Sequence, residues 1–123
     1  MVGRKVLFDT NILIDYLSGV AKARTELSHF SDRAISIVTW MEVMAGTTPQ
    51  DEAQIQAFLA AFRSFPITQE VAERSFNLRR QQKIKLPDAI ILATAQLENR
   101  LLITRNTRDF SAGSPGVRIP YRL

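Results

Sequence analysis

Short apolar runs alternate with longer amphipathic segments along the chain. The run KVLF at residues 5–8 and the β-branched run AISIVT at 34–39 are typical of buried strands. LLITR at 101–105 predicts a third strand. VRIPY at 117–121 predicts a last strand at the edge of the sheet, because Pro120 cannot donate a ladder hydrogen bond.

Helical patterns fill the intervals between these strands. In the clearest one, Thr48 is the expected N-cap, Pro49 occupies the first helical position, and Pro66 ends the helix. Its apolar face consists of Ile55, Phe58, Leu59 and Phe62. The other predicted helices span residues 11–18, 21–30, 40–45, 68–82 and 87–99. Strands that alternate with helices predict an α/β fold, a three-layer α/β/α sandwich around a central parallel sheet.

Composition narrows the class of protein. A length of 123 residues suits a single domain, residues 1–123, and 46% hydrophobic residues suit a globular core. The absence of cysteine excludes thiol catalysis and disulfides, and it fits a cytoplasmic location. No signal peptide or membrane span is expected. The net charge of +4 fits either a polyanionic partner or simply a basic surface.

Four acidic residues occupy related positions in this pattern. Asp9 follows the first predicted strand, Glu42 the second, and Asp109 the third, while Asp88 opens the buried helix that leads into the third strand. In a parallel sheet the carboxyl ends of the strands share one edge, and ligands bind there. We therefore expect the four carboxylates to gather at this edge.

Each acid also has a local explanation. Thr39 and Glu42 have the spacing of a capping box, and Asp9 can cap the helix that follows it. Asp88 lies in the first turn of a helix, and Asp109 follows Asn106 at capping distance. Taken one at a time, each acid is explained better by capping than by a shared site.

Clustering shifts the balance towards a metal site. Two unit charges about 4 Å apart repel by about 4 kcal/mol at an effective dielectric constant of 20, which exceeds a capping gain. A site built from oxygen ligands without Cys or a nearby His favours a hard cation, Mg²⁺ or Mn²⁺. Such a cation supports hydrolysis of a phosphodiester, with one ion or with two.

Other chemistries find less support in the sequence. The sole histidine, His29, excludes a two-histidine ribonuclease mechanism, and no glycine-rich phosphate loop is present. A phosphoacceptor signalling domain would need adjacent acids near its first strand, and an aspartate-nucleophile phosphatase would need D-x-D where this chain has D-T-N. A non-catalytic RNA-binding module on the same scaffold remains an alternative. The aromatic residues Phe8, Phe58, Phe62 and Phe76 are expected in the core.

Four blocks of the sequence resemble one family. LFDTNILIDYL, ISIVTWMEVMAG, LPDAIILATA and LLITRNTRDF together resemble the PIN-domain ribonucleases, and more narrowly the VapC-type toxins of type II toxin–antitoxin pairs. The resemblance spans most of the chain, and the blocks occur in the family's order. It implies an α/β/α sandwich and an endoribonuclease that depends on Mg²⁺ or Mn²⁺.

The resemblance also assigns residues and partners. The four acids would be the catalytic and metal-binding residues, with Asp109 rather than Asn106 as the fourth. Supporting roles are implied for Asn11, Thr39, Thr104 and Asn106. The implied partners are an RNA substrate, a cognate antitoxin and a second copy of the chain in a homodimer.

Overall fold

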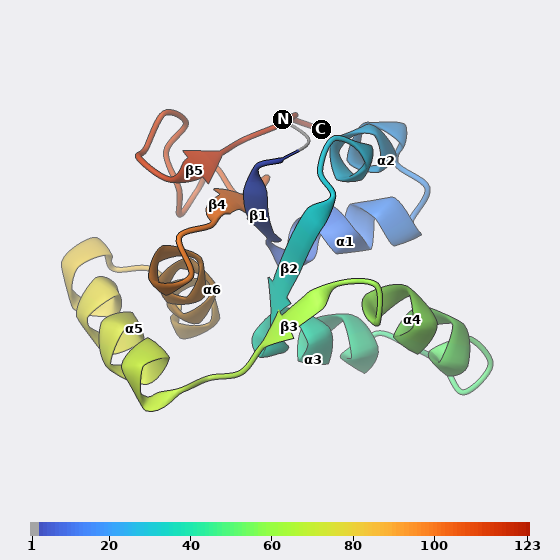
Figure 1. Ribbon diagram of the computed structural model, residues 1–123, viewed down its shortest axis with the longest axis horizontal. Helices are drawn as coiled ribbons and strands as arrows, with labels where there is room; N and C mark the ends of the chain where they lie inside the picture. Colours follow the sequence, from blue (N-terminus) through green and yellow to red (C-terminus); the bar gives the residue numbers. More distant parts are fainter. Residues whose placement is uncertain (1–2) are drawn as a thin grey trace.

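A five-stranded sheet with the order β3-β2-β1-β4-β5 runs through the molecule (Figure 1). The computed structural model describes residues 3–123. The strands are β1 (Lys5–Phe8), β2 (Asp32–Ser36), β3 (Arg63–Phe65), β4 (Leu101–Ile103) and β5 (Val117–Arg118). Every pair of neighbouring strands is parallel, so all five strands end at the same edge. The predicted α/β class with a parallel sheet is confirmed.

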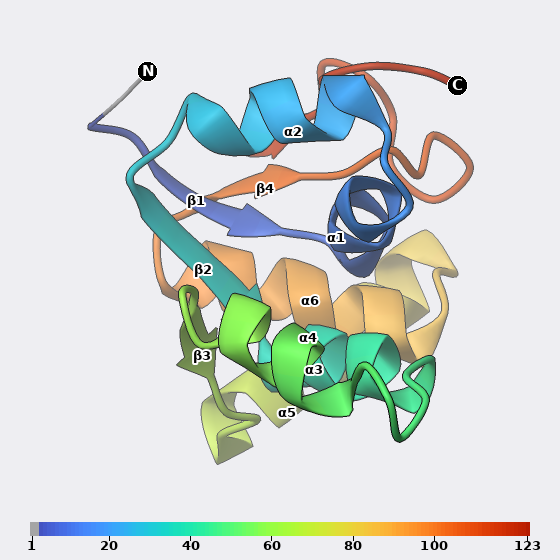
Figure 2. The same ribbon diagram turned by 90° about the vertical axis from the view of Figure 1, so that its right-hand side faces the viewer.

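Within residues 3–123, six helices cover the two faces of this sheet. They are α1 (Thr10–Leu17), α2 (Ala21–Ser28), α3 (Ile37–Ala45), α4 (Glu52–Leu59), α5 (Gln69–Gln82) and α6 (Leu86–Leu97). Side chains alternate along β1: Leu7 packs with apolar residues of α5 and α6, whereas Val6 and Phe8 pack with those of α1 and α2. Figure 1 shows α1 and α2 on one side of β1 and α6 on the other, and in Figure 2 α2 lies above β1 and α6 below it. The predicted three layers follow from this alternation.

Several helices begin and end where the sequence predicts. The Thr68 hydroxyl accepts a hydrogen bond from the backbone N–H of Val71 at 3.1 Å and so caps α5. Pro87 lies in the first turn of α6. After α1, Gly19 has φ +87°, a conformation that glycine adopts without strain.

The second strand ends earlier than predicted. β2 stops at Ser36, whose hydroxyl accepts from the N–H of Val38 at 3.0 Å, and α3 begins at Ile37. The predicted capping box is therefore wrong, because Thr39 lies inside α3 and is fully buried. The β-branched run hides this boundary, since its residues suit either a strand or a buried helix.

The segment between α3 and α5 departs most from its prediction. α4 begins only at Glu52, and Thr48 instead donates to Asp51 from its backbone N–H and its hydroxyl. Arg63–Phe65 forms β3, an edge strand beside β2, where a continuing helix is expected. Phe62 is buried in the turn before it.

Three smaller expectations are also corrected. Residues 107–109 form a turn where the start of a helix is expected from Asn106 onwards, and the last strand is limited to Val117–Arg118. Phe76 is not a core residue, since its side chain is 53% exposed on α5.

Among residues 3–123, no helix combines the length and apolarity needed to cross a membrane.

Candidate active site

A cleft of about 520 Å³ opens at the carboxyl edge of the sheet. It is lined by Asn11, Glu42, Lys85, Pro87, Asp88, Arg105, Asn106, Thr107, Arg108 and Asp109. Three of the four acids expected at this edge therefore face one cleft. Asp9 lies directly after β1 and is only 3% exposed, so it is the most deeply buried of the four.

Three donors hold the buried carboxylate of Asp9. Its Oδ1 accepts from the backbone N–H of Thr10 at 2.7 Å, which makes Asp9 the N-cap of α1. Its Oδ2 accepts from the Thr104 hydroxyl at 2.7 Å and from the Asn11 amide at 3.3 Å. Burial nevertheless raises the pKa of Asp9, against the effect of these hydrogen bonds, and the charge of Glu42 adds to the rise.

Asn11 is itself fixed in position. Its Oδ1 accepts from the backbone N–H of Arg105 at 3.1 Å, so its Nδ2 is directed towards Asp9 and Thr104. Thr104 follows β4 and accepts from the N–H of Asn106 at 3.0 Å while it donates to Asp9. These hydrogen bonds link the ends of β1 and β4.

Glu42 reaches the same edge from the middle of α3. Its Oε1 accepts from the Thr10 hydroxyl at 2.6 Å, and the hydroxyl oxygens of Thr10 and Thr39 are 2.9 Å apart. Thr39 precedes Glu42 by almost one helical turn, which places both side chains on the same side of α3. Thr39 thus contacts the site through Thr10, a residue that the sequence reasoning did not select.

Asp88 and Asp109 form a carboxyl–carboxylate pair. They share a hydrogen bond, which requires one proton between them. Burial, this hydrogen bond and the charges of Asp9, Asp109 and Glu42 raise the pKa of Asp88 to about 7. Asp109 carries the charge, because its hydrogen bonds to Asp88 and Asn106 and the cations Lys85 and Arg108 lower its pKa.

The turn after β4 positions Asp109. The Asn106 side chain accepts from the backbone N–H of Arg108 and Asp109, at 3.2 and 3.1 Å, and donates to Asp109 Oδ2 at 3.0 Å. Asn106 therefore holds the fourth acid on the cleft rather than standing in its place. The three-residue spacing between Asn106 and Asp109 predicts a contact between their side chains. The contact forms in a turn and not at the start of a capped helix.

The donor set has the chemistry that a hard cation requires. Four carboxylates and several neutral oxygen groups meet here, without sulfur or imidazole. Within residues 3–123, no three acidic or histidine side chains already stand together as a metal-binding group. The acids instead contact hydroxyls, amides or one another. Burial is the largest cause of the raised pKa of Asp88, and the charges of its acidic neighbours, which a cation would offset, add to the rise.

A fifth acid, Asp15, lies beside the site and was not identified from the sequence. It accepts a two-pronged ion pair from Arg105, with distances of 2.6 and 2.9 Å, and a hydrogen bond from the Tyr121 hydroxyl at 2.8 Å. Asp15 follows Asn11 by four residues, so both lie on the face of α1 that contacts Arg105. This four-residue spacing is the one feature of the sequence near Asp15 that indicates its contact with Arg105.

Comparisons of the sequence with a family profile and with known proteins point to the same family. The PIN domain profile matches residues 6–113. Ribonuclease VapC10 of Mycobacterium tuberculosis (strain ATCC 25618 / H37Rv) is 34% identical over 113 residues, which cover 85% of each protein. Ribonuclease VapC1 of Methanocaldococcus jannaschii is 30% identical over 112 residues, 86% of this chain and 79% of the relative.

A solved structure agrees with the sequence relatives. A chain from a toxin–antitoxin complex of Klebsiella pneumoniae superimposes with a TM-score of 0.93 at 51% identity, covering 97% of this chain and 100% of that one. Sequence, fold and the acid-lined cleft thus lead to the same assignment. The chain belongs to the PIN-domain family and, within it, to the VapC-type proteins.

Proposed function

We propose that this chain is a divalent-metal-dependent endoribonuclease and the toxin of a type II toxin–antitoxin pair. The observation that carries the proposal is the gathering of four acids at one edge of the sheet: Glu42, Asp88 and Asp109 line the cleft, and Asp9 lies buried after β1. Burial, together with the neighbouring acids, raises the pKa of Asp88 there to about 7. The relatives named ribonucleases and the structural neighbour from a toxin–antitoxin complex support it.

Four residues are proposed to hold the cation, which we assign as Mg²⁺ or Mn²⁺. They are Asp9, Glu42, Asp88 and Asp109. The proton shared by Asp88 and Asp109 has to leave before both carboxylates can act as ligands. When bound, the cation supplies Lewis acidity at the phosphodiester and lowers the pKa of water for hydrolysis.

The surrounding polar residues are proposed to orient these acids. Thr104 and Asn11 fix one oxygen of Asp9, Thr10 with Thr39 fixes Glu42, and Asn106 fixes Asp109. Because each acid enters the site in a fixed orientation, little reorganisation is needed when the cation and substrate bind. Lys85 and Arg108 at the rim are suited to attract the phosphates of RNA.

The proposed partners follow from the same assignment. They are an RNA substrate, a cognate antitoxin that blocks the cleft, and a second copy of the chain in a homodimer. We propose a cytoplasmic location, because the RNA substrate is found there.

RNA cleavage by a matched set of variants tests the proposal. We expect the wild type to cleave RNA in Mg²⁺ or Mn²⁺ and to lose activity in EDTA. Asp9→Asn should cleave at least about 100-fold more slowly, because a buried ligand charge is removed. Its melting temperature without metal should match or exceed that of the wild type, since a desolvated charge disappears.

The control is Glu52→Gln, which removes an exposed acid in the first turn of α4. This variant should cleave RNA like the wild type. Wild-type rates for Asp9→Asn, or cleavage that EDTA leaves unchanged, would refute the metal-dependent mechanism. RNA binding without any cleavage by the wild type would favour a non-catalytic module.

A further inference from the structure

An arginine at the wall of the acidic cleft is bound by one edge of its side chain. Arg105 lines the cleft, and its Nε and Nη2 donate to the two carboxylate oxygens of Asp15 at 2.6 and 2.9 Å. A guanidinium group is a planar fork with five N–H donors, so a carboxylate bound at this edge leaves Nη1 directed away from it. The Asp15 side chain is buried, whereas that of Arg105 is 33% exposed. The ion pair therefore buries the acid and leaves part of the arginine accessible.

Two further contacts fix the orientation of this arginine. The Tyr121 hydroxyl donates to the same Asp15 carboxylate at 2.8 Å. The backbone N–H of Arg105 donates to Oδ1 of Asn11 at 3.1 Å. A side chain that is held at its backbone and at one edge of its head group loses little conformational freedom when it binds a ligand.

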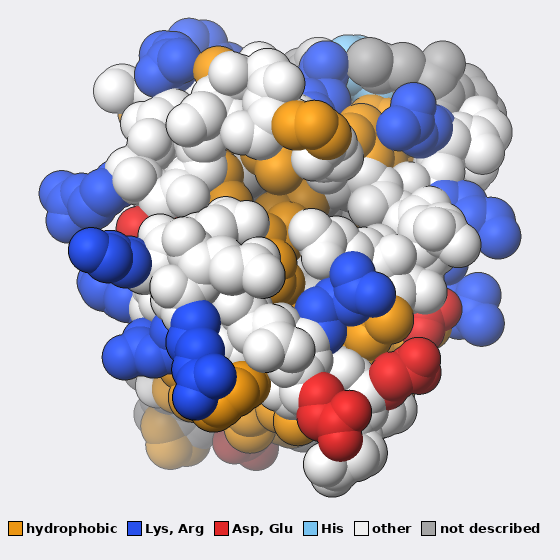
Figure 3. All heavy atoms as spheres, turned by 90° about the vertical axis from the view of Figure 1, so that its left-hand side faces the viewer, with side chains coloured by type: hydrophobic (Ala, Val, Ile, Leu, Met, Phe, Trp, Pro, Cys, Tyr) orange, Lys and Arg blue, Asp and Glu red, His pale blue; other side chains and the backbone are white. Residues whose placement is uncertain are grey.

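The other two cations that line the cleft act on a different acid. The charges of Lys85 and Arg108 lower the pKa of Asp109, and Lys85 is the N-cap of α6. Arg105 is instead bound to α1 through Asp15. Basic side chains also gather along one edge of the face that carries α5 (Figure 3). The cations of the cleft are thus divided between the α6 side and the α1 side.

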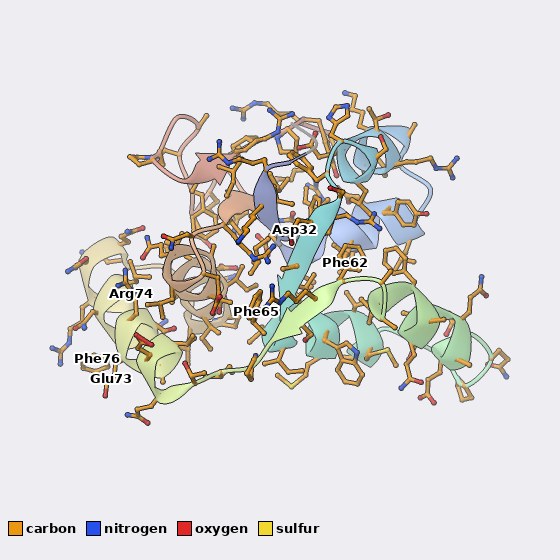
Figure 4. All side chains as sticks on the ribbon, viewed as in Figure 1. Asp32, Phe62, Phe65, Glu73, Arg74 and Phe76 are labelled. Carbon is orange, nitrogen blue, oxygen red and sulfur yellow. The ribbon has the colours of Figure 1, made fainter. Side chains whose placement is uncertain are left out.

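A second arginine–aspartate pair shows what a purely structural arginine looks like. Arg100 donates to Asp32 at 2.8 Å and to the backbone carbonyl of Val6 at 3.2 Å. Its guanidinium carbon lies 5.2 Å from the centroid of the Phe65 ring; Asp32 and Phe65 are labelled in Figure 4. The Arg100 side chain is only 2% exposed, so it cannot reach a ligand in solvent. Arg105 differs from it in exposure and in its position on the acidic cleft.

The accessible edge of Arg105 suits one class of ligand. Oxygens of a phosphate accept short, charge-assisted hydrogen bonds from a guanidinium group. Because Asp15 already balances its charge, Arg105 adds little net charge to the cleft, and the salt-dependent attraction of RNA is left to Lys85 and Arg108. What Arg105 supplies is a hydrogen bond in a fixed direction, which positions a substrate.

We infer that Nη1 of Arg105 donates to a non-bridging oxygen of the RNA phosphate next to the one that is cut, and that Asp15 and Tyr121 hold it in this orientation. The phosphate that is cut has to lie against the four acids. Arg105 is bound to a different acid on α1, so the phosphate within its reach is a neighbouring one. The inference rests on the proposed function and names a substrate contact within it.

Cleavage of a single-stranded RNA by Arg105→Lys tests the contact. The lysine keeps a positive charge beside Asp15, but one ammonium group cannot replace both edges of the fork. We expect kcat/KM to fall at least about tenfold, as for the loss of a charge-assisted hydrogen bond. Tyr121→Phe keeps the ring and removes only the hydroxyl, so it should lower kcat/KM by about threefold.

The matched control is Arg118→Lys. Arg118 binds the buried carboxylate of Glu26 through the same two atoms, Nε and Nη2, at 2.6 and 3.0 Å. Its exposure is similar, at 30%, but it is not among the residues that line the acidic cleft. Circular dichroism melting should show a comparable loss of stability in both variants, whereas Arg118→Lys should cleave RNA like the wild type.

An uncharged methylphosphonate in place of one phosphate at a time locates the contact. At one position next to the cut, this change should lower kcat/KM of the wild type about tenfold. The same RNA should slow Arg105→Lys by less than about twofold, because the contact is already absent in that variant. Fluorescence anisotropy with the same RNAs, in an Asp9→Asn background, measures the dissociation constant without cleavage.

The outcomes separate this contact from the nuclease activity. An Arg105→Lys variant that cleaves like Arg118→Lys would overturn the inference, and so would methylphosphonates that slow the wild type and Arg105→Lys equally at every position. A wild type that cleaves no RNA would refute the proposed function. In that case, a dissociation constant that Arg105→Lys leaves unchanged in the Asp9→Asn background would overturn the contact as well, and an increase of about tenfold would support it.

Discussion

Two acids of one cleft are held in opposite ways. Asp9 is nearly fully buried, but three donors direct their hydrogens at its oxygens. Asp88 is less buried, yet desolvation together with its carboxyl neighbours raises its pKa to about 7. Burial is the largest cause of the raised pKa of both carboxyls; the hydrogen bonds to Asp9 oppose this rise, whereas the acidic neighbours of Asp88 add to it.

The raised pKa of Asp88 predicts how the stability of the metal-free protein depends on pH. Between pH 4 and pH 7 the folded chain retains a proton on Asp88 that the unfolded chain, with a pKa near 3.8, has lost. This stabilising contribution is complete below pH 4 and declines as the pH rises to about 7. The low pKa of Asp109 acts only below pH 4, outside this range.

Urea unfolding in EDTA at pH 5 and pH 7 measures the effect. The free energy of unfolding should fall more between these two values in the wild type than in Asp88→Asn, which cannot titrate at this position. Glu52→Gln should keep the wild-type dependence. An identical change in Asp88→Asn and the wild type would show that Asp88 is already ionised at pH 5.

At the scale of elements, one residue joins three segments. The backbone N–H of Arg105, after β4, binds Asn11, and its guanidinium binds Asp15 one turn further along α1. Tyr121, in the C-terminal segment, donates a further hydrogen bond to Asp15 from its hydroxyl. The position of Asn11 against Asp9 therefore depends on how α1 is fastened to the end of β4.

Removing the Arg105 side chain should weaken this attachment. Arg105→Ala leaves the buried Asp15 carboxylate without its cation, and we expect a loss of about 2–4 kcal/mol in the free energy of unfolding, towards the lower end because Arg105 is 33% exposed. Asp15→Asn in the same chain should recover part of the loss, because the uncompensated charge is gone. Thermal or urea unfolding provides the measurement.

Arg108→Ala is the matched control, since it removes an exposed arginine from the same turn. It should change the free energy of unfolding by less than about 0.5 kcal/mol. Equal effects of the two substitutions would mean that the ion pair with Asp15 contributes nothing specific.

At the scale of the whole molecule, 16 basic residues outnumber 12 acidic ones. Three of the acids nevertheless line one cleft. The cations that line this cleft are Lys85, Arg105 and Arg108. Arg105 is committed to Asp15, which leaves Lys85 and Arg108 as the lining cations best placed for an RNA backbone. Substrate affinity should therefore depend on salt.

Fluorescence anisotropy with single-stranded RNA, in an Asp9→Asn background that does not cleave it, tests this expectation. The logarithm of the association constant should fall linearly with the logarithm of the salt concentration. Replacing Lys85 or Arg108 by Ala should reduce the slope by about 0.7 for each phosphate that the protein no longer neutralises. Replacing Arg63, an exposed cation on β3, should leave the slope unchanged. An affinity that does not vary with salt would contradict contacts with the RNA backbone.

The sequence by itself determined the parallel α/β class and the edge at which the acids lie. Apolar runs such as residues 5–8 can be satisfied only by burial, and the acid that follows such a run necessarily leaves the strand at its carboxyl end. The same holds for the helix after Thr68, whose cap and apolar spacing are local features. Local patterns predicted a helix or strand correctly where the apolar spacing and a capping residue or helix-ending residue indicated the same boundary.

Only the tertiary structure decided the rest. β3 is three residues long and gains its hydrogen bonds from β2 alone, so nothing in its own sequence distinguishes it from the end of the preceding helix. The proton shared by Asp88 and Asp109, and the attachment of Asp15 to Arg105 and Tyr121, join residues 21, 90 and 106 positions apart. Contacts of this kind depend on how the helices pack against the sheet, and the spacing of apolar residues along the chain does not predict them.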